Sequence, residues 1–183
     1  MRHLFTLILL FFFSVSASAA ELSGVTMSET MAVGGKTLVL NGMGLRKKAI
    51  IKVYVAGLYL PAKESSAERI LGSNTERGMV MEFVRGVDKE KICNAWHEGL
   101  EKNSPDKAVQ LKGQFDVLCT YMEEMEDGSK LTFAYIPGQG TTVSLDGAVK
   151  GSIAGKDFAD ALFACWIGPK PPGEDFKAGL LGS

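Results

Sequence analysis

Residues 40–60 constrain the fold of this chain more than any other segment. They read LNGMGLRKKAIIKVYVAGLYL, two runs rich in β-branched and aromatic residues around a short basic stretch, as is typical of an antiparallel hairpin. Arg46 lies within this apolar pattern. Because a buried guanidinium needs an anionic or polar partner, Arg46 can anchor an acidic head group or a polarised carbonyl. The alternative is an exposed arginine beside a solvated turn, since Arg is mostly exposed in soluble domains.

The same segment resembles a known family. Gly42, Gly44 and Arg46, followed by residues 51–60 (IKVYVAGLYL), are similar to a motif of the chalcone isomerase-like family. Residues 163–168 (FACWIG) and 179–182 (GLLG) resemble later segments of that family, in the same order. The resemblance implies the fold more specifically than the activity. The family contains true isomerases, fatty-acid-binding proteins and members with no known activity.

The pattern of the whole chain predicts an α+β fold. Strands are expected in a hairpin over residues 25–39 and near residues 37–46, 49–60, 78–84, 130–136, 141–145 and 148–153. Helices are expected near residues 65–71, 88–103, 105–122, 157–166 and 175–181. This order favours an antiparallel β-sheet covered by a layer of α-helices. The resemblance implies the same architecture, the chalcone isomerase-like open-faced β-sandwich, with a ligand cleft between sheet and helices.

Residues 1–20 have the features of a secretory signal peptide. Arg2 precedes an apolar run over residues 4–13, and small residues follow at 17–20. The run is shorter than the roughly 20 residues that span a bilayer. We therefore expect cleavage near Glu21, a single chalcone isomerase-like domain over residues 21–183, a periplasmic location, and no stable membrane insertion after cleavage.

Composition and histidine content exclude several classes of function. The formal net charge is −1, which gives no electrostatic footprint for nucleic acid. After the leader, His97 is the only histidine, so a multi-histidine metal site is excluded and a Ser-His-Asp site would need His97 as its base. We expect no metal and no cofactor. The expected partner is a small-molecule ligand.

The three cysteines do not form a metal-binding pattern. Cys93, Cys119 and Cys165 include no C-x-x-C pair, so zinc is not expected. In an oxidising compartment two of them can be bridged, and Cys93 with Cys119 is the preferred pair because both fall on consecutive expected helices. The alternative is three buried thiols that act as small apolar residues.

The family resemblance implies that Arg46 and Tyr54 hold the carboxylate of a fatty acid. A guanidinium can form a bidentate charge-assisted pair with a carboxylate, and a phenol adds one donor. Both residues must lie on one face of the hairpin, and a register change of one residue would separate them. The acyl chain would lie between sheet and helices. Its candidate lining residues, each of which could also be ordinary core, are Phe83, Trp96, Phe115, Phe133, Phe163 and Trp166.

The resemblance also leaves open an isomerase, an intramolecular lyase of the chalcone isomerase type. Arg46 would then be catalytic and would polarise the ketone of a small enone or phenolic substrate. Tyr54 and Cys165 stand where the plant enzymes have threonines, and Val87 stands nearest their catalytic tyrosine. The cation is kept while the hydroxyls that organise water are largely lost, which favours binding over catalysis.

Asn94, on the helix expected near residues 88–103, is a further candidate. Asn94 corresponds to the asparagine of the central helix in the plant enzymes, so the ligand-binding candidates besides Arg46 and Tyr54 are Asn94, Trp96, Cys165 and Trp166.

A third alternative is an interaction protein that keeps the fold and uses no pocket. A cleft blocked by the side chains of Trp96 and Trp166 would favour it.

Overall fold

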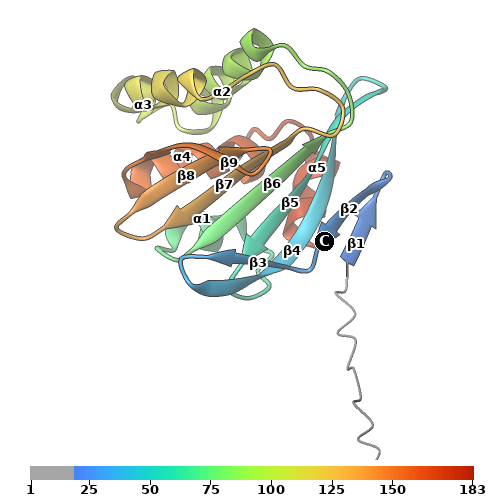
Figure 1. The fold of residues 1–183 in the computed structure, drawn as a ribbon. Helices are drawn as coiled ribbons and strands as arrows, with labels where there is room; N and C mark the ends of the chain where they lie inside the picture. The colour runs from blue at the N-terminus through green and yellow to red at the C-terminus, as the bar shows by residue number, and fades with distance from the viewer. Residues whose placement is uncertain (1–18) are drawn as a thin grey trace, which may run out of the picture.

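The computed structural model describes residues 19–183, and most of the expected leader lies outside these residues. The main sheet is antiparallel, with seven strands in the order β3-β4-β5-β6-β7-β8-β9 (Figure 1). Its strands are β3 (Thr30–Val33), β4 (Lys36–Lys48), β5 (Ile51–Leu60), β6 (Arg77–Phe83), β7 (Lys130–Ile136), β8 (Gly140–Leu145) and β9 (Ala148–Ile153). Neighbouring strands are consecutive in the chain, so each is joined to the next without a crossover.

Helices cover one face of this sheet. They are α1 (Ala67–Gly72), α2 (Lys89–Asn103), α3 (Ala108–Thr120), α4 (Lys156–Ile167) and α5 (Glu174–Leu181). The largest hydrophobic cluster lies between helices and sheet. The α+β architecture expected from the sequence is confirmed. No helix of residues 19–183 is long and apolar enough to span a bilayer.

A small hairpin, β1 (Ala19–Leu22) with β2 (Val25–Ser28), lies on the opposite face of the sheet. Val25 and Met27 pack there against Val55 of β5. The expectation of one hairpin over residues 25–39 is therefore only half right, because β2 pairs with β1 instead of joining the main sheet. Cleavage before Glu21 would remove two of the four residue pairs between β1 and β2.

Two glycine motifs that are far apart in the sequence meet where α5 packs on β4. A Cβ added at Gly42 would lie 2.1 Å from the carbonyl oxygen of Gly179, and one at Gly44 would lie 2.4 Å from that of Phe176. A Cβ at Gly179 would in turn lie 2.4 Å from the carbonyl oxygen of Met43. These glycines are needed because helix and strand backbones approach too closely for any side chain.

Buried Asn41 holds the same junction. The pairing of β4 with β5 shifts between Leu40 and Gly42, which leaves Asn41 at an irregularity in the strand. Its amide nitrogen donates to the carbonyl oxygen of Leu180 (2.8 Å) and to that of Glu64 (3.0 Å). Its amide oxygen accepts from the backbone nitrogen of Glu64 (2.8 Å). One side chain thus joins β4, α5 and the loop before α1.

A second arginine, Arg77 at the start of β6, is completely buried. It forms an ion pair with Asp160 of α4 and donates to the carbonyl oxygen of Ile70 (3.0 Å). Its guanidinium carbon lies 4.9 Å from the ring centre of Tyr135 and 4.8 Å from that of Phe163. All these partners belong to the chain, so Arg77 holds α1 and α4 on the sheet.

Candidate functional site

Arg46 and Tyr54 lie opposite each other on neighbouring strands. The register of β4 with β5 pairs them directly, and a shift follows between Arg46 and Lys47. Residues opposite each other in an antiparallel pair share a face. The ring of Tyr54 lies 5.5 Å from that of Phe83 and 5.8 Å from that of Phe176 in α5, so the shared face is the one that the helices cover. The requirement that the two candidates lie on one face is thus met.

The Tyr54 hydroxyl lies among other candidate residues. Tyr54 keeps some exposed surface, yet burial raises the pKa of its phenol above the ordinary value. The Arg46 charge and the Trp166 side chain act in the opposite direction on this pKa, and Cys165 raises it slightly. Arg46, Cys165 and Trp166 therefore all lie near the Tyr54 side chain, between β4, β5 and α4.

Arg46 itself is half-buried and keeps unused donors. Its guanidinium donates to the carbonyl oxygen of its neighbour Lys47. Within residues 19–183 no carboxylate forms an ion pair with it. Glu98 of α2 is near enough for Arg46 to help lower its pKa, but the main cause of that lowering is its hydrogen bond with Lys102. A guanidinium has five N–H donors, so most remain available to an anion.

Cys165 serves as a small packing residue at this site. Burial raises the pKa of its thiol to about 12, which disfavours the reactive thiolate. Gly99 of α2 faces it so closely that an added Cβ would lie 2.6 Å from Sγ. Gly99 therefore allows α2 to approach α4 above the candidate site.

The two candidates on α2 point in different directions. Trp96 is buried and lies edge-on to Phe133 (5.8 Å between ring centres) and to Trp166 (5.4 Å). Its indole nitrogen Nε1 has no acceptor among the described residues. Asn94 is exposed, two residues before Trp96 and so on the far side of the helix. The structure does not bring Asn94 to the site.

The space expected to hold an acyl chain is filled by side chains. Trp166 lies 5.5 Å from Phe133 and 5.9 Å from Phe163 between ring centres, with Trp96 beside it. These rings interdigitate as in any protein core. The expected lining residues, all buried in one cluster, are Phe83, Trp96, Phe115, Phe133, Phe163 and Trp166. In this structure they form core, because apolar side chains from α2, α3 and α4 reach the sheet and pack together there.

A hollow of about 540 Å³ lies beside the site, between β4, α5 and the β1–β2 hairpin. Its apolar lining comes from Leu22, Met43, Leu45, Pro172 and Phe176, and its charged lining from Lys47, Glu174 and Asp175. Phe176 also contacts Tyr54, so it separates the hollow from the Arg46–Tyr54 pair. The sequence analysis did not single out Phe176, and no local pattern could, because its contact with Tyr54 joins distant parts of the chain.

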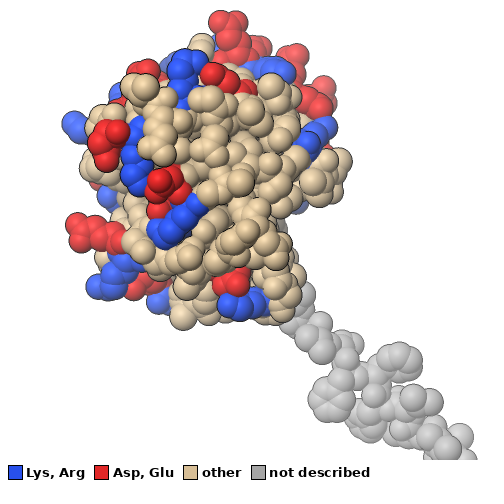
Figure 2. Space-filling view, turned by 90° about the vertical axis from the view of Figure 1, so that its left-hand side faces the viewer, with Lys and Arg blue, Asp and Glu red and all other residues tan. Residues whose placement is uncertain are grey.

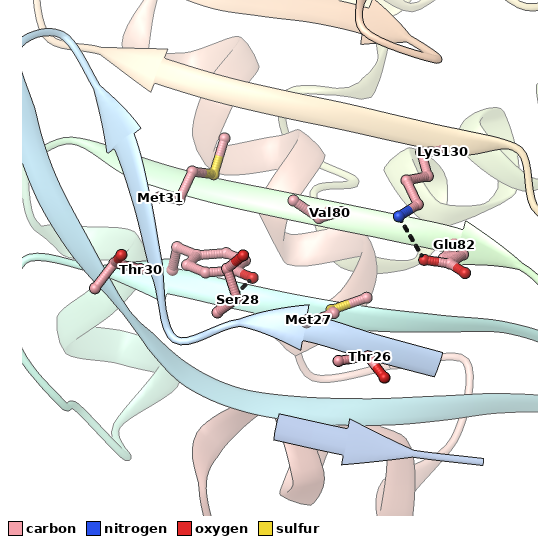
Figure 3. Close-up of a pocket in the computed structure, with 9 residues that line it drawn as sticks. Thr26, Met27, Ser28, Thr30, Met31, Val80, Glu82 and Lys130 are labelled. Carbon is pink, nitrogen blue, oxygen red and sulfur yellow. Dashed lines mark hydrogen bonds and ion pairs between the residues drawn. The ribbon is translucent and has the colours of Figure 1, made fainter. Parts of the chain in front are cut away.

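A smaller hollow of about 230 Å³ lies on the opposite face of the sheet, under β2 (Figure 3). Met27, Met31 and Val80 point into it. An ion pair between Lys130 and Glu82 (3.0 Å) lies at one end. This hollow contains none of the residues that the sequence nominated.

The cysteine pair lies between α2 and α3, away from Arg46. Cys93 and Cys119 are present as thiols, and Cys93 Sγ donates to the carbonyl oxygen of Cys119 (3.8 Å). Burial, followed by the neighbouring Cys93, raises the pKa of Cys119 to about 12. His97 Nε2 lies 3.9 Å from Cys119 Sγ and 3.3 Å from Asp116. His97 therefore faces α3 rather than the candidate site, and oxidation of the two thiols to a disulfide stays a prediction.

The described residues offer no cluster for a metal ion. Within residues 19–183 no group of three or more His, Cys, Asp or Glu side chains is placed to hold one.

On the face shown in Figure 2, acidic and basic side chains alternate around a broad uncharged area. Val87, nearest the position of the plant tyrosine, forms an isolated bridge with Met125.

Comparisons with known proteins agree with this fold. The model of the chalcone isomerase-like family matches residues 19–182. The crystal structure of a fatty-acid binding protein from Arabidopsis thaliana is similar, with a TM-score of 0.73 and 16% sequence identity. The match covers 90% of this chain and 96% of that one. Among curated proteins, no sequence matches the chain.

Proposed function

The chain belongs to the chalcone isomerase-like family, and we propose that it is a non-catalytic member that binds a fatty acid or a similar amphipathic carboxylate. The observation that carries the proposal is the pairing of Arg46 with Tyr54 on the helix-covered face, where no carboxylate of residues 19–183 forms an ion pair with Arg46. The similar Arabidopsis structure, titled a fatty-acid binding protein, supports the choice of ligand.

The two side chains suit a carboxylate. Arg46 would receive it through two parallel N–H donors, the strongest arrangement for such a pair. The raised pKa of Tyr54 keeps its phenol protonated at neutral pH, so that it can donate a further hydrogen bond. The carboxylate of the ligand would also compensate for the free energy that the half-buried Arg46 loses by its partial desolvation.

We place the acyl chain in the hollow of about 540 Å³ beside Phe176, and this placement requires the Phe176 ring, which lies between the hollow and Tyr54, to move aside when the carboxylate reaches Arg46. Its volume falls within the range of about 300–1,000 Å³ usual for small-molecule sites, and Met43 and Leu45 line it. In the variant Met43→Trp the hollow narrows, so affinity should fall more for long-chain than for short-chain fatty acids. An equal fall for all chain lengths would contradict this placement.

Calorimetric titration with a medium- or long-chain fatty acid tests the head-group assignment. We expect Arg46→Gln to weaken binding about 10- to 150-fold, because a hydrogen-bonded charge is worth about 1.5–3 kcal/mol. Lys48→Gln is the matched control, since Lys48 is a nearby exposed cation at the end of the same strand. Unchanged affinity in Arg46→Gln would show that Arg46 does not hold the head group.

One observation favours a second candidate, an interaction protein without a ligand. Trp96 and Trp166 fill the space between sheet and helices, 5.4 Å apart at their ring centres. If the wild-type protein binds no fatty acid of any chain length in the same titration, this candidate replaces the first.

We also infer that the protein is exported to the periplasm. The leader-like sequence of residues 1–20 supports this location. Cell fractionation combined with mass spectrometry of the N-terminus tests it. Export should give a mature chain that begins near Glu21, whereas retention of Met1 in exported material would contradict cleavage.

A further inference from the structure

The tip of the β4–β5 hairpin carries two exposed aliphatic side chains. Ile50 is 94% exposed and Ile51 is 47% exposed. The two strands extend past their neighbours, and their turn projects freely from the molecule at the upper right of Figure 1. Exposed apolar surface raises the free energy of the protein in water, so covering these two side chains would be favourable.

The turn at this tip differs from the other hairpin turns of the described chain. Those turns contain glycines with positive φ, namely Gly24, Gly34, Gly35, Gly138 and Gly147. The β4–β5 turn instead places Ala49 at φ 55°, followed by Ile50. A left-handed alanine is disfavoured, and polar or glycine residues usually form such turns. The turn therefore contains alanine and isoleucine where turn geometry alone favours glycine or asparagine.

Cations surround the two isoleucines. Lys47 and Lys48 precede the turn, and Lys52 follows it, all three exposed. No acidic residue lies within residues 46–52, and Glu98 of α2, whose pKa Lys48 helps to lower, is hydrogen-bonded to Lys102. Glu174 and Asp175 of α5 line the same hollow as Lys47. Lys48 and Lys52 therefore supply most of the positive charge beside the two isoleucines.

We propose that the β4–β5 tip docks on the surface of an anionic lipid bilayer. Ile50 and Ile51 enter the interfacial layer, and Lys47, Lys48 and Lys52 lie against lipid phosphates. A bilayer fits better than a protein partner, because two side chains on a projecting turn cannot cover the roughly 1,200 Å² that a stable protein interface needs. The docking is peripheral and goes beyond the proposed ligand binding, on which it does not depend.

Flotation with lipid vesicles tests the proposal. The purified protein should float with phosphatidylcholine vesicles that contain about one third phosphatidylglycerol, and not with pure phosphatidylcholine. Lys48→Gln combined with Lys52→Gln should weaken binding about 25-fold, from about fivefold per charge. Ile50→Asp should weaken vesicle binding at least tenfold, since it removes the aliphatic side chain that the bilayer would bury. Val109→Asp, at a position 93% exposed on α3, is the matched control and should bind as the wild type does.

Three results would overturn the proposal. Wild-type protein that fails to float with anionic vesicles excludes docking and leaves a protein partner as the alternative. Loss of binding in the lysine variant but not in Ile50→Asp shows adsorption without insertion. An equal loss of vesicle binding in Val109→Asp would show that the β4–β5 tip is not the specific contact with the bilayer. Fatty-acid affinity in solution should be unchanged in Ile50→Asp, so failure here and failure of the proposed function remain distinguishable.

Discussion

Two arginines face the helical layer from opposite ends of the sheet, and their surroundings differ. Arg77 is fully buried, with Asp160, the carbonyl oxygen of Ile70 and two aromatic rings as partners. Arg46 is half-buried and bonds only to the carbonyl oxygen of Lys47 within the described residues. A sequence shows two arginines in apolar strands. Only the arrangement of their partners shows that one is used by the fold and that the other is available to a ligand.

The comparison predicts first that the two arginines differ in their effect on stability. Arg77→Met should lower the free energy of unfolding by about 1.5–3 kcal/mol, because it removes charge-assisted hydrogen bonds to Asp160 and Ile70 while Lys156 still pairs with Asp160. Arg46→Met should change it by less than about 1 kcal/mol, since Arg46 forms no ion pair within residues 19–183. Urea unfolding followed by circular dichroism measures both values. Similar losses would show that the distinction between the two arginines is wrong.

Replacement by lysine, which keeps the charge, tests whether the planar guanidinium is needed for stability at each of the two positions. Arg77→Lys should cost about 2 kcal/mol, because an ammonium cannot stack between Tyr135 and Phe163 while reaching Asp160. Arg46→Lys should leave the free energy of unfolding within about 0.5 kcal/mol of the wild type. A tolerated Arg77→Lys would mean that charge alone, rather than the planar guanidinium, stabilises that end of the sheet.

The smallest expected effect concerns Tyr54 at alkaline pH. Its raised pKa favours the protonated phenol in the folded state, so its contribution to stability is complete below pH 10 and is lost as pH rises through the folded-state pKa. Tyr54→Phe should therefore reduce the loss of stability between pH 8 and 10.5 by less than about 1 kcal/mol.

Absorbance titration of the Tyr54 phenol tests whether Arg46 lies close to it. Because the Arg46 charge lowers the pKa of Tyr54, Arg46→Gln should raise that pKa further. An unchanged titration of Tyr54 in Arg46→Gln would show that the two groups are not close in solution.

Local pattern was enough to predict the sheet and the helices. Alternation in segments such as residues 130–136, together with turn signals such as Asp146 and Gly147, specifies strands and hairpins directly. It was not enough for the β1–β2 hairpin, whose first strand overlaps a stretch with the composition of a cleavage site.

The candidate site was predictable only in part. Residue type suggested Arg46 and Tyr54, but their shared face depends on irregular pairing at Asn41 and after Arg46, which no local pattern reveals. Helical spacing places Asn94 and Trp96 on opposite sides of α2, so Asn94 could have been rejected from the sequence. A filled interior was one of the alternatives, but the sequence could not decide between it and an open cleft, because packing between α2, α4 and the sheet is a property of tertiary structure.

The junction of β4 with α5 has a consequence for biosynthesis. Asn41 and Leu180, which it joins by a hydrogen bond, are 139 residues apart. On the ribosome β4 emerges early, yet the helix that covers Gly42 and Gly44 is synthesised only after all the other strands. Contacts of such separation slow folding, and partly covered strands are prone to association in the meantime. The sheet can therefore be completed only when the C-terminal end of the chain is available to fold onto β4.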